Sequence, residues 1–139
     1  MDALPVVEFA LPGPLRDRLV AAIVAGEKTT TSSLYEEWTR DGEPLPSAGR
    51  REVVVDSAGV GVCVTETVEV STCRLADIAM AHAVGEGEGF TTVAEWRSAH
   101  EESWGSAEFR ASVGEPQIRI DDDTLIVCEE FRLISRLSP

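Results

Sequence analysis

The sequence predicts a single α+β domain in which helices pack against one side of a small sheet or barrel. Three observations lead to this fold class. A helical pattern opens the chain, segments rich in β-branched residues occupy its middle and its end, and two further helical patterns lie between those segments. The length of 139 residues suits one hydrophobic core and is too short for two domains, so residues 1–139 are expected to form one unit.

Residues 14–25 are expected to form the first helix. Apolar residues recur there at helical spacing, a proline suits the first turn, and Gly26 suits the C-terminal cap. The hydroxyl-rich residues that follow are expected to form a loop. A short helix is then expected over residues 33–38, because a serine followed three positions later by a glutamate is a capping-box pattern.

Four later segments have the composition of strands. Residues 52–56 and 60–70 are rich in valine and flank a short turn, which predicts a hairpin. Residues 125–134 begin with an unbroken apolar run and are expected to form a buried strand. Residues 116–120 are expected to form an edge strand.

Two helices are expected between these strands. The first covers residues 75–84 and ends in a glycine-rich loop at residues 85–90, where helix is disfavoured. Thr92 and Glu95 form a second capping-box pattern. It opens a helix that continues or restarts toward residue 109.

The composition limits the classes of partner. A formal net charge of −13 and a pI near 4.4 argue against a broad electrostatic grip on nucleic acid, but they leave room for a nucleoside or a short RNA segment. No apolar run approaches the roughly 20 residues that cross a bilayer, and the N-terminus does not resemble a signal peptide. The three cysteines show no CxxC spacing, so neither a disulfide framework nor a zinc site is indicated. A cytoplasmic protein without a membrane partner or a cofactor is expected.

Lys28 is the only lysine in the chain, against eleven arginines, and it lies in a hydroxyl-rich segment at residues 26–33. Arginine stays charged at any working pH, whereas burial can neutralise a lysine amine and make it a base or a nucleophile. The segment therefore indicates a reactive site. The alternative is an ordinary solvated turn.

The glycine-rich loop supplies two carboxylates, Glu86 and Glu88. Hydrolysis of an acyl or phosphoryl bond needs a nucleophile, a group that takes its proton, and a group that orients that base. A threonine hydroxyl, a lysine of lowered pKa and a carboxylate can fill these roles, although a charged Lys28 paired with Glu86 would instead have a raised pKa. Two exposed turn acids or a metal contact are the alternatives for the loop. The hydroxyl-rich segment lacks the residue order of a phosphate-binding loop, and the glycine-rich loop lacks the dinucleotide-binding fingerprint.

Trp96, Arg97 and His100 lie within one turn of the same expected helix, and Trp96 and His100 share a face. They are candidates for ligand contacts, with the tryptophan ring available to stack on a base. Alternatively, the tryptophans are core anchors and His100 forms a hydrogen bond between them. His82 is expected to be a packed or surface residue.

Five short segments together resemble the ASCH domain family. In chain order they are residues 26–31, 42–46, 83–89, 95–100 and 128–131. The resemblance covers nearly the whole chain and implies a β-barrel related to the PUA fold, flanked by helices, with a cleft between barrel and helices. The chain resembles the longer bacterial members of the family, because the small bacterial members lack the extended glycine-rich loop and the Trp-Arg-x-x-His helix.

ASCH domains are associated with RNA, some are ribonucleases, and small bacterial members are amidohydrolases of N4-acetylcytidine. The resemblance to these small enzymes implies that Lys28, Thr31 and Glu86 are the working residues. Thr31 would be the nucleophile, Lys28 its base or electrostatic activator, and Glu86 the group that orients Lys28. Seven further residues are expected to contact the ligand, namely Thr29, Thr30, Ser32, Glu88, Trp96, Arg97 and His100.

The expected partner is a nucleoside or a short single-stranded RNA, and the expected reaction is hydrolysis of an acylated pyrimidine nucleoside. Ser32 and Ser33 stand where the small amidohydrolases have a basic residue near an acid. Fold analogy alone does not transfer an activity. A non-catalytic RNA-binding module remains an alternative, as does a ribonuclease that uses Glu86, Glu88 and His100 with a metal ion.

Overall fold

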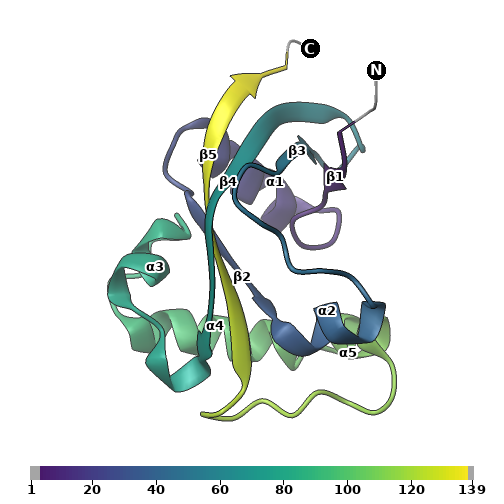
Figure 1. Cartoon of the computed structure of the whole chain (residues 1–139), viewed down its shortest axis with the longest axis vertical. Coiled ribbons are helices and arrows are strands. Elements are labelled where there is room, and N and C mark those ends of the chain that lie inside the picture. Colours follow the sequence, from purple (N-terminus) through teal and green to yellow (C-terminus); the bar gives the residue numbers. More distant parts are fainter. Residues whose placement is uncertain (1–3, 138–139) are drawn as a thin grey trace.

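The computed structural model describes residues 4–137 and shows a mixed α+β fold with a five-stranded sheet (Figure 1). In chain order the elements are β1 (Val6–Val7), α1 (Pro14–Val24), β2 (Thr30–Leu34), α2 (Tyr35–Asp41), β3 (Arg51–Val55), β4 (Gly61–Arg74), a 3-10 turn (Leu75–Asp77), α3 (Met80–Gly85), α4 (Val93–Trp104), α5 (Ala107–Val113) and β5 (Leu125–Arg136). The α+β class of the predicted fold is therefore confirmed. Among the described residues, no helix is long and apolar enough to cross a membrane.

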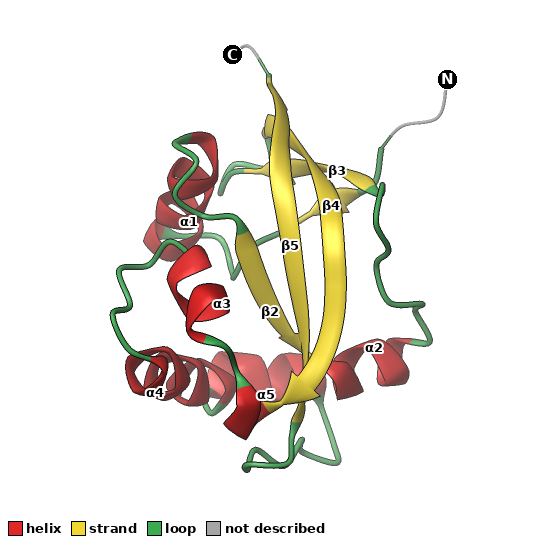
Figure 2. Ribbon diagram, turned by 60° about the vertical axis from the view of Figure 1, so that its left-hand side comes forward, coloured by secondary structure: helices red, strands yellow, loops and turns green. Residues whose placement is uncertain are grey.

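The sheet has the strand order β1-β3-β4-β5-β2, and Figure 2 shows its four longer strands, β2 to β5. β1 runs parallel to β3, and the other neighbouring strands are antiparallel. The predicted hairpin is confirmed as β3 and β4. Within residues 4–137 the two edge strands, β1 and β2, are not paired with each other. The sheet is therefore open, and the closed barrel implied by the family resemblance is not confirmed.

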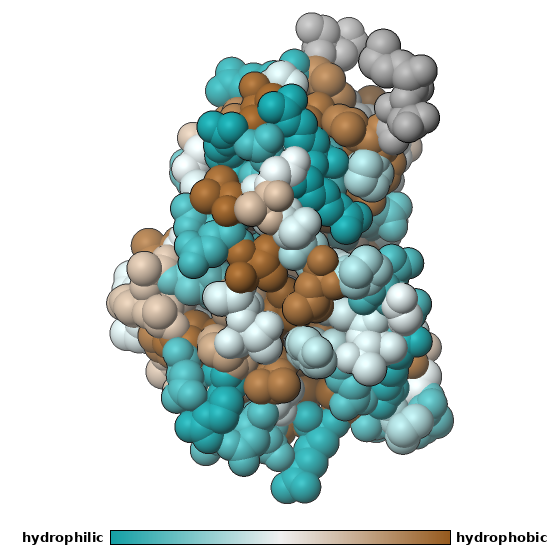
Figure 3. Space-filling model, in the orientation of Figure 1, coloured by the Kyte–Doolittle hydropathy of each residue, from teal (hydrophilic) through white to brown (hydrophobic). Residues whose placement is uncertain are grey.

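Two hydrophobic clusters lie on opposite faces of the sheet. Cys128 belongs to the cluster that includes Trp96 and Trp104 of α4, whereas Phe131 belongs to the cluster that includes Ile23 of α1. Residues an odd number apart on a strand point to opposite faces. The helices thus do not all pack on one side, contrary to the expectation from sequence. Hydrophilic residues surround small groups of apolar ones on the face shown in Figure 3.

The hydroxyl-rich segment differs most from its expected form. Residues 30–34 are strand β2, which pairs with residues 126–130 of β5. A strand forms there because threonine is β-branched and the first, buried half of β5 offers an unpaired edge. Leu34 is fully buried, and its N–H donates to the Glu37 carboxylate at 3.1 Å, so α2 begins slightly later than predicted.

Two other expectations are corrected. Residues 116–120 form no strand, because Pro116 has no N–H to donate and Ile118 and Ile120 instead pack against the α4 cluster. The helix expected over residues 75–84 is a 3-10 turn followed by α3, since Ile78 between them has an extended backbone. The capping box of Thr92 and Glu95 is confirmed at the start of α4.

Candidate functional site

The hydroxyl-rich segment and the glycine-rich loop, 58 positions apart, are in direct contact. The Thr29 N–H donates to the Gly85 carbonyl at 2.7 Å. A Cβ atom at Gly87 would lie 2.7 Å from the Glu27 carbonyl oxygen and 2.8 Å from the Lys28 Cα, and the φ of Gly87 is 73°. Only glycine permits this approach and this backbone conformation together. Gly87 therefore allows the two segments to pack this closely.

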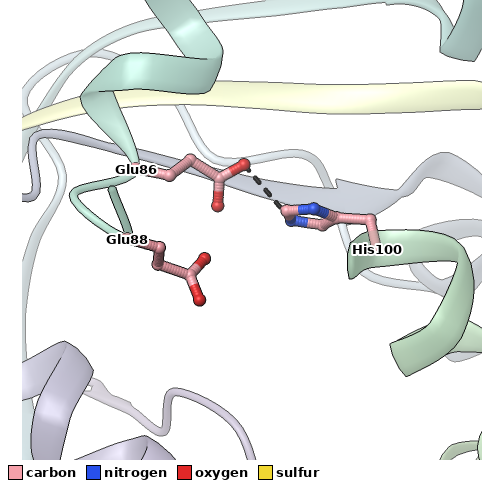
Figure 4. A group of neighbouring side chains, drawn as sticks. All are labelled: Glu86, Glu88 and His100. Atoms are coloured by element: carbon pink, nitrogen blue, oxygen red, sulfur yellow. Dashed lines mark ion pairs between the residues drawn. The ribbon is translucent and has the colours of Figure 1, made fainter. Parts of the chain in front are cut away.

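Glu86 lies at the centre of the resulting polar cluster and is only 3% exposed. Its Oε2 atom accepts hydrogen bonds from the Ser32 hydroxyl at 2.7 Å and from the Trp96 indole N–H. His100 Nε2 lies 3.3 Å from the same oxygen, and Figure 4 shows the imidazole facing the carboxylate. Burial alone would raise the pKa of Glu86, but the contacts and charge of His100, with Lys28 and Trp96, outweigh it and lower the pKa to about 2. Glu86 is therefore a carboxylate.

Lys28 is buried and lies against this carboxylate. Its Nζ atom donates to the Thr30 carbonyl at 2.8 Å and to the Glu86 carbonyl at 3.3 Å, and it lies 3.6 Å from Glu86 Oε1. Three acceptors match the three N–H groups of an ammonium. Burial lowers the pKa of Lys28 more than the charges of Glu86 and Glu88 raise it. The three contacts of Lys28 therefore fit an ammonium, while burial lowers its pKa below that of an exposed lysine.

His100 has a tautomer that its neighbours define. Its Nδ1 lies 2.8 Å from the Trp96 carbonyl oxygen, which can only accept, so Nδ1 carries a proton. The other nitrogen, Nε2, faces Glu86. Burial lowers the pKa of His100, but the hydrogen bond and the charge of Glu86 raise it by a larger amount, so the pKa is shifted upward overall. The ring also stacks on Trp96, with centroids 4.2 Å apart.

His82 is the site residue that the sequence reasoning missed. Its Nε2 lies 2.6 Å from the Ser32 hydroxyl, which itself donates to Glu86. Burial, first of all, and the nearby charges of Lys28 and His100 lower the pKa of His82 despite the opposing effect of Glu86. A neutral ring whose Nε2–H donates to Ser32 fits these contacts. The sequence pattern that could have identified His82 is its spacing from Glu86, because residues four apart share one face of a helix.

The register of β2 separates the neighbouring hydroxyls. Thr30 donates to the His82 carbonyl at 2.8 Å, and Ser32 donates to Glu86, so both point toward α3. Thr31 lies between them and projects to the opposite face, beside its cross-strand partner Glu129. The structure therefore brings Lys28, Ser32 and Glu86 together and does not place the Thr31 side chain with them.

Three other predicted contact residues are more exposed than Lys28 and Glu86. Arg97 faces away from the cluster and forms ion pairs with Glu101 at 3.0 Å and Asp122 at 2.7 Å. Thr29 is exposed at the start of the hydroxyl-rich segment. Glu88 lies beside Glu86. Its side chain as a whole is exposed, but partial burial of the carboxylate, followed by the Glu86 charge, raises its pKa.

Glu86, Glu88 and His100 can also hold a metal ion. One ligand atom from each lies within 4.8 Å of the other two, and the three side chains converge in Figure 4. Two carboxylates and one imidazole suit a divalent cation such as Mn²⁺ or Zn²⁺. The hydrogen bond from His100 Nδ1 to a backbone carbonyl is the support that metal-binding histidines usually have.

Comparisons with known proteins agree with this architecture. The family model of the ASCH domain matches residues 8–135. The structure resembles an ASCH domain from Lactobacillus crispatus with a TM-score of 0.80 and 27% identity, over 94% of this chain and 79% of the other. It also resembles protein EF3133 from Enterococcus faecalis, with a TM-score of 0.82 and 24% identity, over 98% and 79% of the two chains.

None of the curated proteins matched the sequence. The family model nevertheless extends from just after β1 almost to the end of β5, so it includes Lys28, Glu86 and His100. The resemblance stated from the short sequence segments is thereby confirmed. This chain belongs to the ASCH domain family.

Proposed function

We propose that this ASCH protein binds a pyrimidine nucleoside or an RNA end beside Glu86 and removes an acyl group from an acylated pyrimidine nucleoside. The observation that carries the proposal is the buried pair of Lys28 and Glu86, whose Nζ and Oε1 atoms lie 3.6 Å apart. A lysine of lowered pKa, oriented by a carboxylate, is suited to proton transfer. The reaction adds water across the acyl C–N bond and yields a free amine and a carboxylic acid.

In this proposal Lys28 moves the proton and Glu86 orients it. The Lys28 amine donates to the Thr30 carbonyl, one residue before the predicted nucleophile Thr31, whose own side chain points to the opposite face of β2. Ser32 is the competing nucleophile, because its hydroxyl already donates to Glu86. Comparison of Thr31→Val with Ser32→Ala decides between them, since only the variant that lacks the attacking hydroxyl loses turnover.

The test is incubation of the purified protein with N4-acetylcytidine and related acylated nucleosides, followed by chromatography. The wild type should release the acyl group, whereas Lys28→Arg and Glu86→Gln should lose at least about 100-fold in turnover, which is the size of a typical proton-transfer contribution. Arg119→Ala is the matched control, because Arg119 is an exposed cation outside the cluster. Unchanged turnover in Lys28→Arg would refute the proton-transfer role.

The group of Glu86, Glu88 and His100 favours one second candidate, metal-assisted cleavage of single-stranded RNA. A divalent cation held there would activate water or stabilise charge on a phosphate. Cleavage of a single-stranded oligonucleotide should then require added Mn²⁺ and stop with chelator, and Glu88→Gln should abolish it. If Lys28→Ala weakens RNA binding while the wild type consumes neither substrate, the domain is a binding module instead.

A further inference from the structure

Two cysteine thiols meet on the same face of the sheet as the Glu86 cluster. Cys73 of β4 and Cys128 of β5 have their Sγ atoms 3.8 Å apart, and both pack in the hydrophobic cluster around Trp96. We propose that Cys73 and Cys128 are a modification site that forms a reversible disulfide when the protein meets a peroxide. This inference is independent of the proposed hydrolytic activity.

The separation of the two sulfurs, 3.8 Å, sets the movement that the bond requires. Cys128 lies opposite Ser71, and Cys73 lies opposite Ile126, so the two thiols are diagonal neighbours on adjacent strands. Disulfide sulfurs lie about 2.05 Å apart, so the two Sγ atoms must approach by about 1.8 Å. Diagonal cross-strand neighbours lie about 7–8 Å apart, at the upper limit for a disulfide, so the bond also requires a local shift of the two strands.

The two thiols differ in access to an oxidant. Cys73 is partly exposed, whereas Cys128 is buried. Burial, followed by the effect of Cys73 and the charge of Glu86, raises the pKa of Cys128 to about 12. A peroxide should therefore react first at Cys73, because oxidation follows exposure and thiolate character.

The chemistry balances in two steps. Peroxide transfers one oxygen to the Cys73 sulfur, which gives a sulfenic acid and one water. The Cys128 sulfur then attacks the Cys73 sulfur and displaces the hydroxyl, which leaves as a second water with the thiol proton. The two thiols lose two electrons in total, and the peroxide gains them. A dithiol reductant reverses the modification by thiol–disulfide exchange.

The bond would form close to the polar cluster. Cys128 is the cross-strand partner of Ser32, and Ser32 donates to the Glu86 carboxylate. Movement of Cys128 toward Cys73 would therefore shift β5 beside Ser32 and change the surroundings of both histidines. The disulfide would link the redox state of the protein to the geometry around Glu86.

The experiment treats the reduced full chain with about one equivalent of hydrogen peroxide and follows intact mass, free thiols and the proteolytic peptides. The wild type should lose two hydrogens, fall from three free thiols to one, and yield a peptide linked through Cys73 and Cys128. A dithiol reductant should restore it. Wild-type protein that keeps all its thiols, only gains oxygen, or links two chains would overturn the proposal.

Two variants complete the test. Cys63→Ala should still form the bond, because Cys63 lies in the other hydrophobic cluster. Cys73→Ser should not form it, and its partly exposed position favours normal folding, which circular dichroism checks. Oxidation should also move the NMR ring signals of the two histidines in the wild type but not in Cys73→Ser. Formation of the bond without any such movement would refute the link to the Glu86 cluster.

Discussion

Arg16 and Lys28 are both buried cations, but their surroundings differ. The Arg16 guanidinium, on the α1 side, donates to the backbone carbonyls of Phe9 at 3.0 Å and Ala10 at 2.7 Å. Lys28 also donates to two carbonyls, but it faces the Glu86 carboxylate as well. Arginine cannot give up its proton in a protein, whereas lysine can. Arg16 therefore stabilises the backbone around Phe9 and Ala10, whereas Lys28 is suited to proton transfer.

The largest expected effect on the free energy of unfolding comes from removing the Glu86 carboxylate beside Lys28. Glu86→Ala leaves the Lys28 ammonium buried without its counter-charge and the Trp96 N–H without an acceptor. The free energy of unfolding should fall by about 3–5 kcal/mol, as measured by urea denaturation. Glu86→Gln keeps a neutral acceptor and should lose less. An equal loss in both variants would show that charge pairing does not stabilise the cluster.

Acid should reduce the contribution of the Glu86 carboxylate to the free energy of unfolding. The pKa of Glu86 is lowered from 4.5 to about 2 in the folded protein, so its stabilising contribution is complete above pH 4.5 and is lost as the pH falls toward 2. The contribution amounts to about 3 kcal/mol. Urea denaturation at a series of pH values should show this fall in the wild type. The dependence should be reduced by this amount in Glu86→Gln, and an identical curve for both proteins would contradict the assignment.

A smaller effect is expected at the other buried cation. Arg16→Ala leaves the carbonyls of Phe9 and Ala10 without their donor and should lower the free energy of unfolding by about 1–3 kcal/mol. Because Arg16 lies outside the Glu86 cluster, turnover or ligand affinity of the folded variant should stay at the wild-type level. A large loss of turnover in a correctly folded Arg16→Ala variant would contradict a purely structural role for Arg16.

The smallest effect is expected on the alkaline side. The pKa of His100 is raised above 6.5 in the folded protein by its contacts with Glu86, which outweigh burial. Its contribution to stability is therefore present below pH 6.5 and is lost as the pH rises through the folded pKa. NMR titration of the ring should report an upward shift in the wild type that Glu86→Gln reduces. A downward shift would contradict the described hydrogen bonding.

Local patterns predicted much of the fold. The spacing of apolar residues predicted α1, and the reciprocal capping residues predicted α4. The valine-rich runs predicted the β3–β4 hairpin, and the unbroken apolar run at residues 125–128 predicted β5. These signals lie within a few residues of each other and need no partner. β2 escaped prediction because its hydroxyl-rich residues are held as a strand only by pairing with β5. The two-residue β1 is too short to give a pattern.

The candidate site was less predictable, because its geometry depends on contacts between distant segments. The composition identified Lys28 as unusual, but its pairing with Glu86 rested on the family resemblance. The choice between Thr31 and Ser32 depends on strand register, and a shift of one residue exchanges the faces of a strand. His82 was overlooked because its role arises from Ser32, which lies 50 positions away.

The position of β5 in the chain has a consequence for biosynthesis. β5 pairs with β2 on one side and β4 on the other, and both strands precede it in the chain. It also contributes Cys128 to one hydrophobic cluster and Phe131 to the other. A nascent chain on the ribosome therefore holds β2 and β4 without their shared neighbour until residues 125–136 emerge. Both hydrophobic faces stay incomplete until then, which makes the arrival of β5 the step that closes the fold.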